Sequence, residues 1–262
     1  MRAQASARRF HLTDALIAGA RAVPAVWAGA WGVLIYLAGV AAAGPLLRPE
    51  GAAAWVQTGA VVLGALAAWG AANRIVIFGH EARHHGLGPA GLQVRGAELA
   101  MIAAAALNLI FLAMILAVLA LVALALFGMA ELDVAAIQAR DWSAVGPPWR
   151  LAVLALVGAI VLAVPVLLTV RLALFTQATV GRGQPVSLNT LGIGEGSFWR
   201  LTILLVVVFA PLAGLVVLAG RGPVEGAAAA VAIAGLWLPF AAGAMGAAYR
   251  GLEYWTRERG VP

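Results

Sequence analysis

The pentapeptide His80-Glu81-Ala82-Arg83-His84 has residue types and a spacing that could perform chemistry. In zinc hydrolases, the two histidines of an H-E-x-x-H sequence lie one helical turn apart and bind the metal, and the glutamate acts as general base toward the metal-bound water. A catalytic zinc also needs a third protein ligand. The candidates for it are His85, Glu98 and Glu195. The motif therefore keeps open a zinc-dependent membrane metalloprotease with His80 and His84 as ligands and Glu81 as the catalytic residue.

The same histidines have a simpler interpretation. His80, His84 and His85 lie close to Arg83 at the end of an apolar segment. Imidazoles at that position can gain charge on mild acidification and contact anionic lipid head groups. They can also be solvated loop residues without a role.

The composition excludes an ordinary soluble domain. The chain of 262 residues is 63% hydrophobic and 11% charged, against about 45–50% and about 25% in soluble domains. Its mean hydropathy is +0.97, it has no cysteine, and all 17 basic residues are arginine. This composition indicates an integral membrane protein.

Six segments are long and apolar enough to cross a bilayer, which takes about 20 residues. They predict an all-α integral membrane protein with six transmembrane helices and amphipathic cytoplasmic elbows. Kinks are expected at the intramembrane prolines Pro165, Pro211 and Pro239. The six segments are Val23–Leu47, Ala52–Phe78, Glu98–Ala130, Trp149–Thr179, Phe198–Gly220 and Gly226–Arg250.

The arginines predict the orientation. Thirteen lie in the two termini and the even-numbered connections, and four lie in the other connections. The positive-inside rule then places both termini in the cytoplasm of a bacterium, with the chain in its inner membrane. The predicted organisation is a cytoplasmic amphipathic arm (1–22), a transmembrane domain (23–250) and a cytoplasmic tail (251–262). The basic excess thus reflects topology, and no nucleic-acid partner is expected.

Two cytoplasmic segments resemble each other. Arg74-Ile-Val-Ile-Phe78 and Arg171-Leu-Ala-Leu-Phe175 each place an arginine before three aliphatic residues and a phenylalanine. We call residues 74–98 the first elbow and residues 171–200 the second elbow. They are either two ordinary helix ends with snorkelling arginines or a duplicated helix–elbow–helix unit. Duplication predicts that the two elbows lie side by side.

The second elbow carries a family resemblance. Val170–Phe175, Ser187–Leu191 and Gly196-Ser-Phe-Trp-Arg-Leu201 form a pattern that is similar to the glycerophosphodiesterase-type membrane domain and the related YciC-like membrane proteins. Asn73–Glu81, with Glu98 opening the third span, likewise resembles uncharacterised polytopic membrane proteins of alphaproteobacteria. The resemblance implies a six-helix membrane domain. Phosphodiesterase activity is not implied, since the chain has no soluble phosphodiesterase domain.

Polar groups inside the predicted spans are few. The central thirds contain no ionisable residue, which disfavours an ion-coupled carrier. Gln57 and Asn108 are the main intramembrane polar groups, and bonds between helices are their usual role. A transporter of a neutral or lipid-like substrate remains an alternative.

The sequence as a whole favours a non-enzymatic membrane protein that is structural, accessory or lipid-interacting, such as a subunit of a membrane complex. Its expected partners are anionic lipids and a protein partner or second copy, and no cofactor is expected. Trp27 and Trp31, four residues apart, could form a helix face for that partner. The arginines expected at lipid phosphates are Arg74, Arg83, Arg95, Arg171, Arg182 and Arg200.

Overall fold

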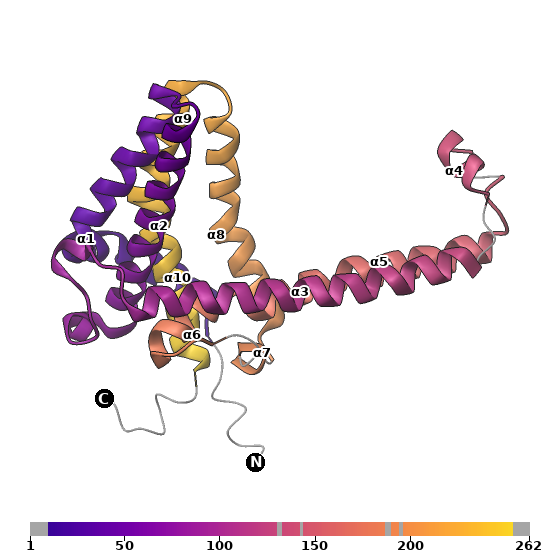
Figure 1. Cartoon of the computed structure of the whole chain (residues 1–262). Helices are drawn as coiled ribbons and strands as arrows, with labels where there is room; N and C mark the ends of the chain where they lie inside the picture. The colour runs from indigo at the N-terminus through magenta and orange to yellow at the C-terminus, as the bar shows by residue number, and fades with distance from the viewer. Residues whose placement is uncertain (1–9, 130–132, 142–143, 187–189, 194–195, 254–262) are drawn as a thin grey trace, which may run out of the picture. The chain divides into compact units, whose positions relative to one another are not determined.

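The computed structural model describes residues 10–129, 133–141, 144–186, 190–193 and 196–253 (Figure 1). Within these ranges the regular elements are all helical, which confirms the all-α fold. The described residues also contain six segments that are long and apolar enough to span a membrane, which confirms the predicted number of spans. They are Leu12–Leu47, Ala52–Arg83, Pro89–Leu126, Leu151–Arg182, Phe198–Ala219 and Pro223–Leu252.

The helices follow one another with short connections. In chain order they are α1 (Leu12–Leu47), α2 (Ala52–Phe78), the 3₁₀ turns η2 (Gly79–Arg83) and η3 (Pro89–Gly91), α3 (Gly96–Met129), α4 (Val134–Ala139), α5 (Pro148–Leu172), α6 (Phe175–Arg182), α7 (Thr190–Ile193), α8 (Phe198–Ala219), α9 (Pro223–Ala232), the π-helical turn η4 (Ile233–Trp237) and α10 (Leu238–Leu252).

The chain divides into two compact units. The larger unit holds the described residues of Met1–Ala105 and Arg171–Pro262, and the smaller one is Ala106–Val170. The larger unit contains α1, α2, α6 and α8–α10, whose long helices lie beside one another in Figure 1. The smaller unit contains most of α3 and α5 with α4 between them.

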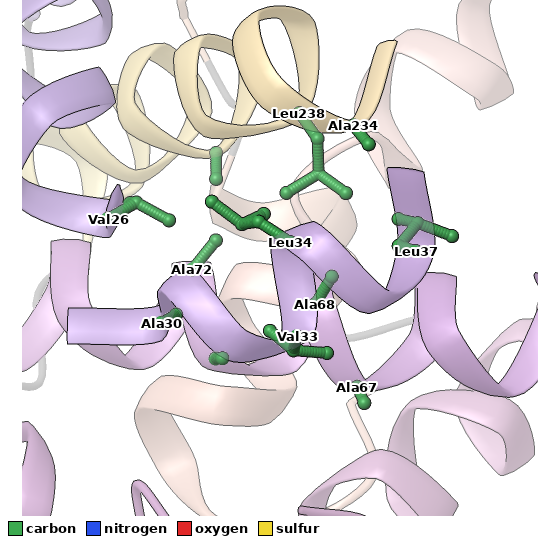
Figure 2. Packing of buried hydrophobic residues seen from close by; sticks show 12 residues of the cluster. Val26, Ala30, Val33, Leu34, Leu37, Ala67, Ala68, Ala72, Ala234 and Leu238 are labelled. Atoms are coloured by element: carbon green, nitrogen blue, oxygen red, sulfur yellow. The ribbon is translucent and has the colours of Figure 1, made fainter. Parts of the chain in front are cut away.

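The core of the larger unit lies between α1, α2 and α10. Figure 2 shows Leu34 and Leu238 within it, close to small side chains of α2 such as Ala68 and Ala72. Seven of the twelve residues in this cluster are alanine. Small side chains let helix backbones approach closely, and this approach produces the van der Waals contact that holds helices together in lipid.

The helices α1 and α10 approach each other closely. A Cβ atom on Gly243 would lie 2.9 Å from the Cα of Gly19 and would overlap the methyl group of Ala22. Glycine is therefore required at this crossing. The fold thus depends on contacts between residues more than 200 positions apart.

The first helix begins within the predicted N-terminal arm (1–22). The helix α1 begins at Leu12 and continues through Ala22 without a break. Ala15, Gly19 and Ala22 are buried at helical spacing, and Gly19 and Ala22 face α10. These eleven residues are therefore the first turns of α1, because their small side chains allow packing on α10. The rest of the arm (1–9) and the tail beyond Glu253 lie outside the described residues.

The prolines act differently from one another. The helices α5 and α8 continue through Pro165 and Pro211 as single elements, whereas Pro239 lies two residues after the end of the π-helical turn η4. The irregular residue of α1 is Ala30 (φ −136°, ψ 27°), where no proline would predict it. A π-helical turn thus precedes Pro239, where the sequence predicts a kink.

The smaller unit has a capped helix in its connection. The side chain of Asp133 accepts hydrogen bonds from the backbone N–H groups of Ala135 (2.8 Å) and Ala136 (3.1 Å), which caps α4. In α3 and α5, large apolar side chains such as Leu109, Leu121 and Leu162 are exposed. Large apolar side chains of these helices are therefore left uncovered by the described residues of the smaller unit itself.

Candidate functional site

The first elbow is closed by a buried ion pair between the last turns of α2 and the start of α3. Arg74 is 2% exposed and Glu98 is fully buried. Nη1 and Nη2 of Arg74 donate to the two carboxylate oxygens of Glu98, with 3.0 Å from Nη2 to Oε2, and Nε donates to the carbonyl of His85 (3.1 Å). The backbone N–H of Arg95 donates to Oε2 of Glu98 (2.9 Å). Two-pronged arginine–carboxylate pairing of this kind fixes geometry as well as charge.

A glycine makes room for this pair. A Cβ on Gly70 of α2 would overlap the carboxylate of Glu98. The absence of a side chain at Gly70 therefore allows Glu98 to reach α2. The ion pair holds together two helices and the loop that joins them.

The loop of the first elbow is seated on α1. Gly91 in η3 has φ +77°, and a Cβ there would come within 2.9 Å of the Ala30 Cα and of a methyl group of Val33. The side chain of Gln93 accepts a hydrogen bond from the N–H of Gly88 (2.8 Å), which closes the turn from within. The loop thus packs against α1 where that helix is irregular.

The second elbow is closed by another pair. Arg182, at the end of α6, donates to the carboxylate of Glu253 from Nε (3.1 Å) and Nη2 (3.2 Å). Glu253 is buried, and it follows the last residue of α10. A Cβ on Gly181 would lie 2.6 Å from the hydroxyl oxygen of Tyr249, so the end of α6 packs tightly on α10. This pair connects α6 to the end of the described chain.

The two elbows differ in their secondary structure and in the helices on which they pack. The first consists of 3₁₀ turns packed on α1 and α2, whereas the second begins with the helix α6, which packs on α2 and α10. Arg171, the counterpart of Arg74, is half-buried, and its Nε has no hydrogen-bond partner among the described residues. The closing arginine of the second elbow is Arg182 instead. These unlike hairpins do not support the duplicated unit.

The H-E-x-x-H sequence does not form a zinc ligand set. Its first four residues lie in the 3₁₀ turn η2, and His84 directly follows this turn; at 3₁₀ spacing, residues four apart point about 120° away from each other. His80 is 94% exposed, and His85 stacks on Phe78 with ring centroids 3.7 Å apart. In the part of the chain that is described, no three histidine, aspartate or glutamate side chains come close enough to hold a metal. The described residues therefore give the metalloprotease alternative no geometric support, and the candidate ligand Glu195 lies outside them.

The predicted lipid-facing arginines occupy different environments. Arg83 and Arg95 are exposed in the first elbow. The half-buried Arg200 donates from Nη1 to the carbonyl of Phe10 (3.1 Å). Arg74 and Arg182 were expected at lipid phosphates, but both are bonded to glutamates because their partners lie on neighbouring helices.

The two intramembrane amide side chains, those of Gln57 and Asn108, differ in their hydrogen bonding. Gln57 of α2 donates from Nε2 to the carbonyl of Val40 on α1, which is a bond between helices. Asn108 of α3 is 9% exposed, and neither its amide oxygen nor its nitrogen has a hydrogen-bond partner among the described residues. Gln57 therefore has a structural contact, and Asn108 is a buried group without one.

The two tryptophans expected on one face of α1 have different neighbours. Trp27 is half-buried and donates from Nε1 to the carbonyl of Gly235 (2.7 Å), whereas Trp31 is 54% exposed. The irregular dihedrals of Ala30 lie between them and change the helical register. Trp27 therefore has a contact within the chain, whereas Trp31 is exposed.

The hydrogen bond between Trp27 and the carbonyl of Gly235 was not predicted from the sequence, although Pro239 could have indicated it. Pro239 has no N–H, so the carbonyl four residues earlier, that of Gly235, loses its helical partner. The indole of Trp27 supplies a replacement donor. Trp237 donates to the carbonyl of Val208 (2.8 Å) on α8, but the carbonyl four residues before Pro211 is that of Val207, so this bond does not replace a donor lost to proline. For the Trp27 bond, an intramembrane proline together with a tryptophan on another span could have predicted the contact.

In the described residues, the side chains of Arg74 and Arg182 thus bond to glutamates within the chain. The side chains of Arg83 and Arg95 are accessible. No family model, curated protein or solved structure matches this chain.

Proposed function

We propose that this protein is a non-enzymatic accessory component of the bacterial inner membrane that holds anionic lipid head groups at its first elbow. One observation carries the proposal. The first elbow fixes its backbone with a buried Arg74–Glu98 pair and leaves Arg83 and Arg95 exposed on the same loop.

The positions of the exposed arginines favour lipid phosphates as their partners. Arg83 ends η2 directly after α2, and Arg95 directly precedes α3. Residues next to span ends lie at head-group depth, where long side chains reach phosphates. Because η3 and the ion pair fix this loop, little backbone entropy is lost when a lipid binds. The excess of arginines at this end supports a cytoplasmic location for the elbow.

The test compares lipid retention between matched charge variants. The double variant Arg83→Gln/Arg95→Gln removes two exposed charges, and Arg48→Gln/Arg140→Gln removes two exposed charges from the opposite connections. Each juxtamembrane arginine contributes about 1 kcal/mol toward anionic lipid, so the first variant should lose about tenfold or more in its preference for phosphatidylglycerol over phosphatidylcholine. Native mass spectrometry after release from mixed vesicles measures this preference. Equal retention in the two double variants would contradict the proposal.

A further inference from the structure

An apolar groove lies on the larger unit, away from the residues of the elbows. It has a volume of about 790 Å³, within the range of about 300–1,000 Å³ that is usual for small-molecule sites. Its walls come from α1, α8 and the segment from α9 to α10. Representative lining residues are Pro211, Gly214, Leu218, Leu236 and Phe240.

One charged residue lines this groove. Arg221 lies in the turn between α8 and α9 and is exposed. Among the described residues no carboxylate forms an ion pair with Arg221, and the nearby Glu225 is exposed and is not bonded to it. The other polar wall residue, Trp237, uses its N–H to bond the carbonyl of Val208. Arg221 is therefore the free cation of the groove.

We infer that this groove binds one acyl chain of an anionic phospholipid, whose phosphate is held by Arg221. The turn that carries Arg221 joins two spans, so the guanidinium lies at head-group depth, and the apolar walls extend from it along the spans. Lipid tails are as apolar as the groove, so the walls alone cannot select a ligand. Selectivity must come from the charge of Arg221, which favours an acidic head group over a zwitterionic one.

This site goes beyond the proposed function. It uses none of the elbow residues, and it lies at the other ends of α8 and α10 from the second elbow. It therefore stands even if the Arg83→Gln/Arg95→Gln variant retains lipid normally. Conversely, its loss would leave the head-group contact of the first elbow intact.

The experiment uses the full chain in vesicles that contain phosphatidylglycerol and phosphatidylcholine with the same photoreactive acyl chain, in separate labelling reactions. The groove is filled by Gly214→Leu, because a Cβ on Gly214 meets no atom within 4 Å and the new side chain enters open space. The matched control is Gly59→Leu on α2, which is equally unobstructed and does not line the groove. Arg221→Gln removes the charge, and Glu225→Gln is its charge-matched neighbour.

The wild-type protein should be labelled by phosphatidylglycerol on peptides that contain 211–221 and 232–240. Gly214→Leu should abolish most of that labelling, and Arg221→Gln should lower the preference for phosphatidylglycerol about fivefold. Gly59→Leu and Glu225→Gln should resemble the wild type. Equal labelling of this region by the two lipids in the wild type would overturn the inference. So would Gly214→Leu behaving like Gly59→Leu.

Discussion

The core between α1, α2 and α10 and the long helices α3 and α5 use apolar residues in opposite ways. The core is rich in alanine and glycine, and its side chains are buried within the chain. The other two helices are rich in leucine and other large apolar residues, most of which are exposed. The segments with the largest apolar side chains are therefore the least buried.

This difference follows from the solvent. In water, large apolar side chains drive helices together, whereas in a bilayer the lipid tails solvate them equally well. Helices then associate where small residues allow close contact and where polar groups find partners. The larger unit has both features: glycines lie at close contacts (Gly243 and Gly70), and the side chains of Arg74 and Trp27 form hydrogen bonds to other helices. The comparison predicts that stability depends on small and polar residues of the larger unit.

The largest expected effect comes from removing one half of the buried ion pair. Glu98→Ala leaves the guanidinium of Arg74 buried without its carboxylate and should cost about 3–5 kcal/mol of stability. Denaturation by SDS in mixed micelles measures this loss. The exposed Glu81→Ala variant in the same elbow is the control.

A double variant separates charge burial from packing at this position. Replacing Arg74 and Glu98 together by leucine removes both charges and should be less destabilising than Glu98→Ala. Equal stability of Glu98→Ala and the wild type would mean that small residues alone hold the larger unit.

The next effect compares two glycines. Gly243→Ala inserts a methyl group against Gly19 and Ala22 and should destabilise the protein by about 1–3 kcal/mol. Gly158→Ala in α5 meets no atom within 4 Å and should stabilise its helix by up to about 1 kcal/mol. The same denaturation assay compares the two variants. A similar loss in both would show that α5 is packed as closely as α10.

A smaller effect is expected from the tryptophan bond. Trp27→Phe leaves the Gly235 carbonyl without its donor and should cost about 1 kcal/mol. Adding Pro239→Ala restores an N–H four residues after Gly235, so the two effects should be less than additive. Trp31→Phe, which alters an exposed ring, should leave stability unchanged. Strict additivity in the double-mutant cycle would refute the coupling.

The smallest effect is expected on α3. Leu121 is 67% exposed, so Leu121→Ala should change stability by less than about 0.5 kcal/mol. The measurement is made on the purified chain, and its oligomeric state is determined in parallel by light scattering. A loss of several kcal/mol would show that another copy or a partner covers this face.

The sequence predicted the spans better than their contacts. The second span was expected at Ala52–Phe78, and α2 has the same limits, because Gly51 and Gly79 flank a continuous apolar run. Helical length and apolarity are local properties. The kink at Ala30 has no local cause in the sequence, and it coincides with the seat of η3 on α1. It could be found only once the first elbow and α1 were placed together.

The candidate site also depends on contacts between distant residues that the sequence could not predict. An arginine count predicts topology, and it treats Arg74 and Arg83 as equivalent. In the structure the two arginines differ, because Arg74 is bonded to Glu98, which lies 24 residues later in the sequence on the other side of the hairpin. Among the described residues Arg83 has no such bond, and its side chain is exposed. No helical spacing rule relates these two residues. The accessible Arg83 and Arg95 were within the predicted set, whereas the groove at Arg221 depends on three segments that are distant in the sequence.

The contact between Gly19 and Gly243 has a consequence for how the protein assembles during its synthesis. A ribosome extends a chain at about 5–20 residues per second, so on the order of ten to forty seconds separate the appearance of these two glycines. During that interval α1 is in the bilayer without its main neighbour, and the carbonyl that Trp27 will bond has not been made. The helix α10 thus packs on α1 long after α1 has been made, and this core cannot assemble before α10 has been synthesised.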